Sequence, residues 1–263
     1  TGTRVAGLHR GTYTHEGFDV VMACWITGAT ALIRQFDQAP DLLHLLASAL
    51  PGGVSMEVRQ GPVPDAQLMV MDRHAESSPA RGGYFGQRGV LSWPPSRTLL
   101  LSGGLLTDHT ANMLLQRIHA FHGQAPESAG MVIVPSETEL KQWLSYRDND
   151  NQALNRTHWM NNYDYRKSIR LINGLPFLDN GWACFVKGEG MAPLGGTVHY
   201  QLKSQPRMWQ IMKDLNLENV HEVIACHEED GLPPTVRRVF PSLHPWALRI
   251  LKLRDLILST AAG

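Results

Sequence analysis

Cys24 and His221 are residues of the types that nucleophilic catalysis uses. Cys24 is followed by Trp25 and then by a run compatible with a helix, and a helix N-terminus lowers the pKa of a thiol by stabilising the thiolate. His221 opens the strand-like run HEVIAC, and a histidine is a common base for a catalytic thiol. One hypothesis is therefore a hydrolase in which Cys24 attacks the substrate and His221 accepts its proton.

The alternative is that Cys24 is a core residue. The order of the two residues is similar to that in papain-like cysteine hydrolases, which include secreted effectors. The third catalytic group is missing, because the next strand-like run, TVRRVF, ends at Pro241 and Ser242 without an aspartate or asparagine. A lone cysteine in an apolar run is more often packed than reactive. We therefore predict no catalytic residue in this chain, with the Cys24–His221 pair as the alternative.

No cofactor or metal site is predicted. His221, Cys226, His227 and Glu228 have ligand chemistry, but their spacing matches no zinc template. On a strand, His221 and Cys226 would also face opposite sides. The chain contains no G-x-x-x-x-G-K-[ST] motif, which excludes nucleotide binding through a P-loop. Three widely spaced cysteines fit a reducing compartment better than a disulfide framework.

The composition excludes several classes of protein. With 24 basic and 24 acidic residues the net charge is zero, which argues against direct nucleic-acid binding. The hydrophobic fraction of 43% is high enough for a packed core. No apolar run reaches the length of a membrane span, and no signal peptide is visible. We expect a cytoplasmic protein, and the start at Thr1 rather than Met suggests a part of a longer one.

The pattern of apolar residues predicts the elements that position these side chains. It favours an α/β or α+β fold, with a mixed sheet packed against helices. Two subdomains are expected, residues 1–147 and residues 148–263, divided at a polar stretch. Strands are predicted at 18–25, 54–59, 98–102, 131–134, 183–187, 197–202 and 220–226, and helices at 28–36, 41–50, 107–121, 136–147, 206–215 and 241–258.

The last predicted helix carries an apolar stripe beside basic residues. Trp246, Leu253 and their neighbours at helical spacing form the stripe, and Arg249 lies among the charges. Such a helix either packs on its own domain or binds a partner. Trp246, Arg249 and Leu253 are the candidate partner contact.

Several local patterns recur in one known order. They are GFD before an apolar run, LPGGVSMEV, SRTLLLS, MVIV before ETELKQWL, Tyr163-Asp164, and VHYQLKSQPRMWQIM. In this order they resemble the N-terminal domain of the conjugative, type IV secretion transfer ATPases of bacteria (the TraC-like family).

The resemblance implies a non-catalytic assembly domain whose ATPase lies in a separate domain. It would dock the motor to the inner-membrane machinery, as an oligomer peripheral to the membrane. Its partners would be other secretion-system proteins and further copies of itself.

Overall fold

The fold was analysed on a computed structural model of the chain. It describes residues 2–9, 17–35, 41–72, 89–93, 97–103, 107–123, 125–145, 153–192, 195–204, 207, 210, 220–227, 235–239 and 245–262. Within these ranges no helix is long and apolar enough to cross a membrane.

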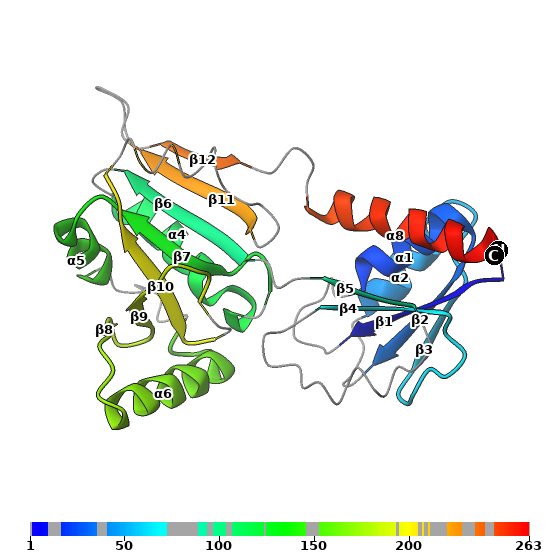
Figure 1. Cartoon of the computed structure of the whole chain (residues 1–263), viewed down its shortest axis with the longest axis horizontal. Coiled ribbons are helices and arrows are strands. Elements are labelled where there is room, and N and C mark those ends of the chain that lie inside the picture. Colours follow the sequence, from blue (N-terminus) through cyan, green and yellow to red (C-terminus); the bar gives the residue numbers. More distant parts are fainter. Residues whose placement is uncertain are drawn as a thin grey trace. The chain divides into compact units, whose positions relative to one another are not determined.

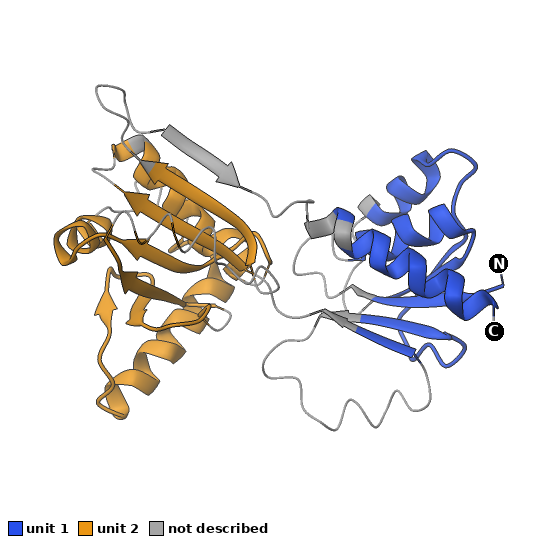
Figure 2. Cartoon of the chain, turned by 45° about the horizontal axis from the view of Figure 1, so that its top comes forward, with its two compact units in different colours: residues 1–95, 242–263 blue, residues 96–241 orange. Residues whose placement is uncertain are grey.

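The chain forms two compact units, each with its own sheet (Figure 2). Unit 1 combines Thr1–Pro95 with Ser242–Gly263, and unit 2 is Ser96–Pro241. Unit 2 is therefore inserted between two parts of unit 1. These boundaries differ from the predicted division into 1–147 and 148–263, while the predicted α/β class with mixed sheets and helices is confirmed.

Unit 1 is built on a five-stranded sheet with the order β3-β2-β1-β4-β5. Every neighbouring pair in this sheet is parallel. Its strands are β1 (Arg4–His9), β2 (Thr30–Gln35), β3 (Met56–Arg59), β4 (Leu68–Asp72) and β5 (Gly89–Trp93), and its helices are α1 (Phe18–Thr27), α2 (Asp41–Ala49) and α8 (Pro245–Ala262).

The two faces of this sheet are covered differently. One face packs against α1, α2 and α8 and forms the larger core, in which α8 lies against α1 (Figure 1). The other face carries Ala6, Leu32 and Met69, which pack with Val63 and Ala66 of the connection from β3 to β4. The alternation of neighbouring strand residues between the two cores is that of a sheet buried on both faces.

Residues 18–27 form a helix, and the predicted strand at 18–25 is wrong. A continuous apolar run does not distinguish a buried helix from a buried strand, but ten residues are long for a strand. Gly17 and Gly28 bound the helix in left-handed backbone conformations, with φ of 90° and 68°. The Gly28 N–H donates to the Cys24 carbonyl and closes the helix. The predicted helix at 28–36 is consequently strand β2.

Unit 2 contains a seven-stranded sheet with the order β12-β11-β6-β7-β10-β9-β8. The two outer strands, β8 and β12, are antiparallel to their neighbours and the inner pairs are parallel. The strands are β6 (Arg97–Gly103), β7 (Ala129–Val134), β8 (Leu178–Asp179), β9 (Cys184–Lys187), β10 (Thr197–Leu202), β11 (Val220–His227) and β12 (Thr235–Val239), and the helices are α4 (Asp108–His119), α5 (Glu137–Ser145) and α6 (Thr157–Ile172).

Two helices of unit 2, α4 and α5, begin where a local side chain accepts a hydrogen bond from one of their free N–H groups. Thr107 caps α4 by accepting from the Thr110 N–H at 3.2 Å. Ser136 and Glu139 form the predicted capping box of α5: the Glu139 N–H donates to Ser136 Oγ, and the hydroxyl donates to the Glu139 carboxylate. The predicted helix at 206–215 lies almost wholly outside the described residues.

A left-handed turn joins α4 to β7. Phe121, His122 and Gly123 have φ of 48°, 55° and 72° in succession, and two of them are not glycine. Trp159 of α6 is fully buried against this turn and donates its indole N–H to the Trp182 carbonyl at 2.7 Å. A Cβ atom on Gly123 would lie 2.4 Å from the Trp159 ring. The turn therefore needs glycine for both its backbone conformation and its contact with the tryptophan.

We predict that Gly123→Ala destabilises unit 2 far more than Gly174→Ala does. Both glycines have positive φ, so both substitutions cost about 1 kcal/mol in backbone strain. Only Gly123 has a neighbour that a Cβ would strike, since nothing lies within 4 Å at Gly174. Overpacking adds roughly 1–3 kcal/mol. Urea unfolding measures both variants, and equal losses would contradict the described contact.

Candidate functional site

The carboxyl edge of the unit 1 sheet is the candidate site. The order β3-β2-β1-β4-β5 reverses direction between β1 and β4, because β2 and β3 extend to one side of β1 while β4 and β5 extend to the other. In open parallel sheets, ligands bind outside the carboxyl ends of the strands at such a switch point. This strand order is that of dinucleotide-binding domains.

Helix α1 lies unusually close to β1. A Cβ on Gly7 would come within 2.9 Å of Val20 Cγ2, so the absence of a side chain at Gly7 permits the contact. The connection between the two elements has glycines at Gly11 and Gly17 but not the G-x-G-x-x-G sequence of many dinucleotide-binding loops. The close strand–helix packing of such domains is present without their usual fingerprint.

The first turn of α1 already holds a carboxylate. Asp19 is buried, its Oδ1 accepts from the Val20 N–H at 3.0 Å, and its Oδ2 lies 3.9 Å from a guanidinium nitrogen of Arg249 on α8. A phosphate at this helix end would face the Asp19 charge. Cationic side chains elsewhere on the edge are therefore better placed to meet a phosphate.

Arginines stand at the ends of β2 and β3. Arg34 and Arg59 are register partners in the parallel pair β2–β3, so their side chains lie on the same face of the sheet. Arg34 is partly buried. In dinucleotide-binding domains an acidic residue near the end of the second strand binds the ribose of NAD, and an arginine accommodates the 2′-phosphate of NADP. In this chain the residue near the end of β2 is an arginine, Arg34.

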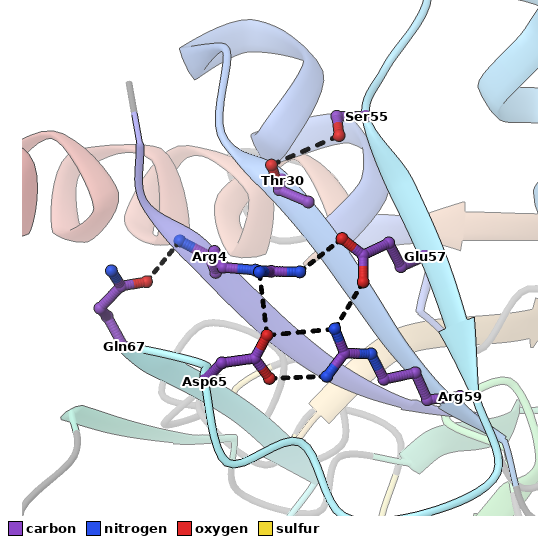
Figure 3. A network of polar contacts seen from close by, with 7 residues as sticks. All are labelled: Arg4, Thr30, Ser55, Glu57, Arg59, Asp65 and Gln67. Atoms are coloured by element: carbon purple, nitrogen blue, oxygen red, sulfur yellow. Dashed lines mark hydrogen bonds and ion pairs between the residues drawn. The ribbon is translucent and has the colours of Figure 1, made fainter.

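A closed ring of charges holds the Arg59 side chain in place (Figure 3). The ring lies on the sheet face that carries Leu32, because Glu57 is the register partner of Leu32. Arg59 contacts Glu57 Oε2 at 2.6 Å and Asp65 Oδ1 at 2.7 Å, while Arg4 pairs with the same two carboxylates. Each cation thus bridges both anions, which links β1, β3 and the connection from β3 to β4. The Arg4 N–H also donates to Gln67 Oε1 at 2.6 Å.

The ring shifts the pKa values of its members in the expected directions. Hydrogen bonds to Glu57 and then to Asp65 raise the pKa of Arg59. The hydrogen bond from Arg59 lowers the pKa of Asp65, with smaller contributions from the charges of both arginines. Two positive and two negative charges leave the ring neutral, so it contributes structure rather than net charge to this face.

All three cysteines are buried and held as thiols. Burial raises the pKa of Cys24 to about 12, with a smaller contribution from the Asp19 charge. Burial also raises the pKa of Cys184 and of Cys226 to about 11. Reactive cysteines have lowered pKa values and partial exposure. This chain therefore offers no thiolate nucleophile at neutral pH.

The cysteine-hydrolase hypothesis is wrong. Cys24 lies in the last turns of α1, where it packs in the core of unit 1, and not at the start of a helix. His221 is in unit 2, buried on β11, with its Nε2 3.7 Å from Glu127 Oε1. A buried, protonated thiol has neither the charge nor the access that a nucleophile needs.

The predicted partner contact on the last helix is mostly internal. Leu253 has no exposed surface and packs in the core of unit 1, and Arg249 approaches Asp19. The side chain of Trp246 lies outside the described residues, although its backbone is in α8. The apolar stripe of this helix packs in its own unit, which is the alternative that the sequence left open.

Among the described residues, no group of histidine, cysteine and carboxylate side chains could hold a metal ion.

The fold is similar to that of solved aldehyde dehydrogenases. KauB from Pseudomonas aeruginosa matches at a TM-score of 0.53 with 12% identity, over 96% of this chain and 58% of its own. An NAD-dependent aldehyde dehydrogenase from Sinorhizobium meliloti matches at 0.53 with 9% identity, over 95% and 57%. An indole-3-acetaldehyde dehydrogenase solved with NAD+ matches at 0.53 with 12% identity, over 85% and 55%.

The chain has an aldehyde dehydrogenase-like fold. It spans somewhat more than half the length of these proteins. No protein-family model matches the sequence, and no curated protein matches it either.

The resemblance to type IV secretion and conjugation ATPases is wrong, and with it the role of an assembly domain docking a motor. The structural neighbours are aldehyde dehydrogenases. The patterns that carried the resemblance, such as a Pro-Gly pair before a strand or an apolar strand before a helix, are common where strands and helices are connected in α/β proteins. Two of its elements were also misassigned, since 18–27 is a helix and 30–35 a strand.

The sequence interpretation missed Arg34 because it placed this residue inside a predicted helix. One signal could have found it: Gly28 ends a ten-residue apolar run, and Thr30–Ile33 after it is a short apolar segment that suits a strand. With β2 assigned, Arg34 falls at a strand end. The ring of charges around Arg59 has no comparable signal in the sequence, because Asp65 reaches Arg59 only through the tertiary fold.

We predict that thiol reagents label none of the three cysteines in the native state at neutral pH. The raised pKa values leave almost no thiolate, and burial blocks access. Mass spectrometry after exposure to iodoacetamide should show labelling only when denaturant is added. Rapid native labelling of Cys24 would contradict its burial in α1.

We predict that Asp65→Asn lowers the thermal midpoint of unit 1 at pH 7 and flattens its dependence on acid. The folded pKa of Asp65 is lowered, so its stabilisation is present above the unfolded value of about 3.9 and is lost as the pH falls through the folded value. The variant and the wild type should therefore converge in acid. Asp255→Asn, which removes a pair with the adjacent Arg254 on α8, is the control and should change the midpoint little.

Proposed function

We propose that unit 1 binds a nicotinamide dinucleotide at the carboxyl edge of its sheet. The observation that carries the proposal is the strand order, with its switch point between β1 and β4. The likeness to aldehyde dehydrogenases, one of them solved with NAD+, supports it. The close packing of α1 on Gly7 fits the first strand–helix unit of such a domain.

The proposed dinucleotide carries a 2′-phosphate. Arg34 supplies a cation at the end of β2, where a domain selective for NAD has a carboxylate. A guanidinium suits a phosphate because it forms paired hydrogen bonds with two of its oxygens. Arg249 lies 3.9 Å from the Asp19 carboxylate at α1, so we assign the phosphate to Arg34 at the end of β2 and not to Arg249.

With a dinucleotide bound, this chain could support fewer kinds of reaction than a dehydrogenase that uses a catalytic cysteine. A bound dinucleotide supplies hydride transfer at its nicotinamide ring. Covalent capture of an aldehyde by a thiolate has no counterpart here, because the three cysteines are buried thiols. We therefore propose dinucleotide binding as the function of this chain and assign it no cysteine nucleophile.

Binding of NADPH and NADH to the wild type and to Arg34→Ala tests the proposal, with isothermal titration calorimetry as the measurement. Loss of a charged hydrogen-bonding partner should weaken NADPH binding about tenfold or more. NADH lacks the 2′-phosphate, so its affinity should change by less than about threefold, well under 1 kcal/mol. Arg254→Ala, which removes an arginine of α8 paired with Asp255, is the matched control and should leave both affinities unchanged.

The outcomes separate the two parts of the proposal. Binding of neither dinucleotide by the wild type contradicts the function itself. Tighter binding of NADH than of NADPH, or an equal effect of Arg34→Ala on both, contradicts only the assignment of Arg34 to the 2′-phosphate.

A further inference from the structure

The outer face of α6 and the segment after it form an exposed apolar patch on unit 2. Six large apolar residues within fourteen positions expose their side chains, among them Ile172 at 80%, Leu171 at 62% and Tyr165 at 60%. The full set is Tyr165, Ile169, Leu171, Ile172, Leu175 and Leu178. We call these six residues the α6 patch. Exposed apolar side chains gathered on one helix and the segment after it indicate an interaction site on a folded protein.

The other helices of unit 2 are polar on their outer faces. The exposed residues of α5 are Glu137, Thr138, Lys141 and Ser145, and those described for α4 with its cap are Thr107, Asp108 and Gln116. Among the described residues of unit 2, the exposed large apolar side chains are therefore concentrated on α6 and the segment after it, and Leu154 is the exception. A helix that packs one face on the core and is apolar on the opposite face needs a second covering surface.

A partly buried polar triad holds the segment after α6 in place. Tyr163 and Lys167 of α6 both bind Asp179 of β8, the tyrosine hydroxyl at 2.8 Å and the ammonium at 2.6 Å. Lys167 also donates to the Tyr163 hydroxyl at 3.0 Å. The triad fastens the end of the segment that follows α6, so the leucines of that segment are presented on an anchored loop. A preorganised surface loses less entropy on binding.

The size of the α6 patch fits association with a second copy of the chain. Residues of this size have accessible areas of about 200 Å² each, so the measured exposures add up to on the order of 600 Å². Two copies facing each other would bury roughly 1,200 Å², the lower end of the range for specific interfaces. A second copy carries the same apolar patch, so each patch can cover the other in a symmetric dimer.

Charge and strand pairing favour the same arrangement. Asp164 and Arg166 border the patch, so its rim carries both signs and can pair with its own copy. Strand β8 ends the sheet, and among the described residues it has a strand partner on one side only. Edge strands related by a two-fold axis meet antiparallel, which an isologous dimer allows. Figure 1 shows β8 and α6 in the same part of unit 2.

We infer that the α6 patch is the interface of a homodimer, in which α6 and the adjoining β8 edge of one copy pack against the same elements of the other. The inference concerns unit 2 and is independent of the dinucleotide proposed for unit 1. The patch supplies the apolar centre, and Asp164 and Arg166 supply a polar rim.

Sedimentation equilibrium of the full chain tests the interface. The wild type should be a dimer, and Ile172→Asp should weaken dimerisation about 30-fold or more, the size of effect that defines a hot spot at the centre of an interface. Leu45→Asp on α2 is the matched control, since Leu45 is also an exposed leucine, at 64%, but lies in unit 1 outside the patch. Ile172 is 80% exposed in the single chain, so the variant should keep the circular dichroism spectrum of the wild type.

Three results would overturn the inference. One is a wild type that stays monomeric at the highest concentration reached, and another is an Ile172→Asp variant that dimerises like the wild type. The third is a monomeric wild type that sediments with phosphatidylserine vesicles while Ile172→Asp does not, which would assign the patch to a lipid surface. A Leu45→Asp variant that dimerises normally beside a monomeric Ile172→Asp variant supports it.

Discussion

The packing of α8 against α1 is the constraint on which unit 1 depends. Leu253 and Ile257 of α8 have no exposed surface, and both belong to the core formed by α1, α2 and one face of the sheet. Without α8 that core would be open on the side of α1, and α1 would expose apolar surface to water. The contact also brings Arg249 to the buried Asp19 carboxylate. The helix α8, after residue 241, thus completes the core on one face of a sheet whose strands all lie before residue 95.

The same packing decides the chemistry of Cys24. Pressing α1 between the sheet and α8 removes the thiol from water and raises its pKa, because the thiolate would be desolvated. The close approach of Val20 to Gly7 places α1 against β1. The cysteine that looked catalytic in the sequence is therefore a core residue, and the proposed site lies instead at the carboxyl edge of the sheet.

The sequence predicted the class of fold and many elements, and it failed where periodicity was ambiguous. The capping box at Ser136 and the helix from Asp41 are confirmed because their signals are local. Residues 18–27 were misassigned because the less buried positions of this helix, such as Met22 and Ile26, are apolar too, so no polar face reveals its period. Helix α6 was missed for a related reason, since its outward face is apolar at Ile169 and Ile172. The insertion of unit 2 into unit 1 leaves no trace in composition, because it is a property of which surfaces meet.

The insertion also sets an order for folding during synthesis. Every residue of unit 2 is made before α8, while the core of unit 1 needs Leu253 and Ile257 of α8. Domains tend to fold as units in the order in which the ribosome delivers them. The inserted unit can therefore be complete while the unit that begins the chain still waits for its last helix, with α1 and its apolar surface uncovered. The growing chain is most exposed to aggregation and to chaperone binding in that interval.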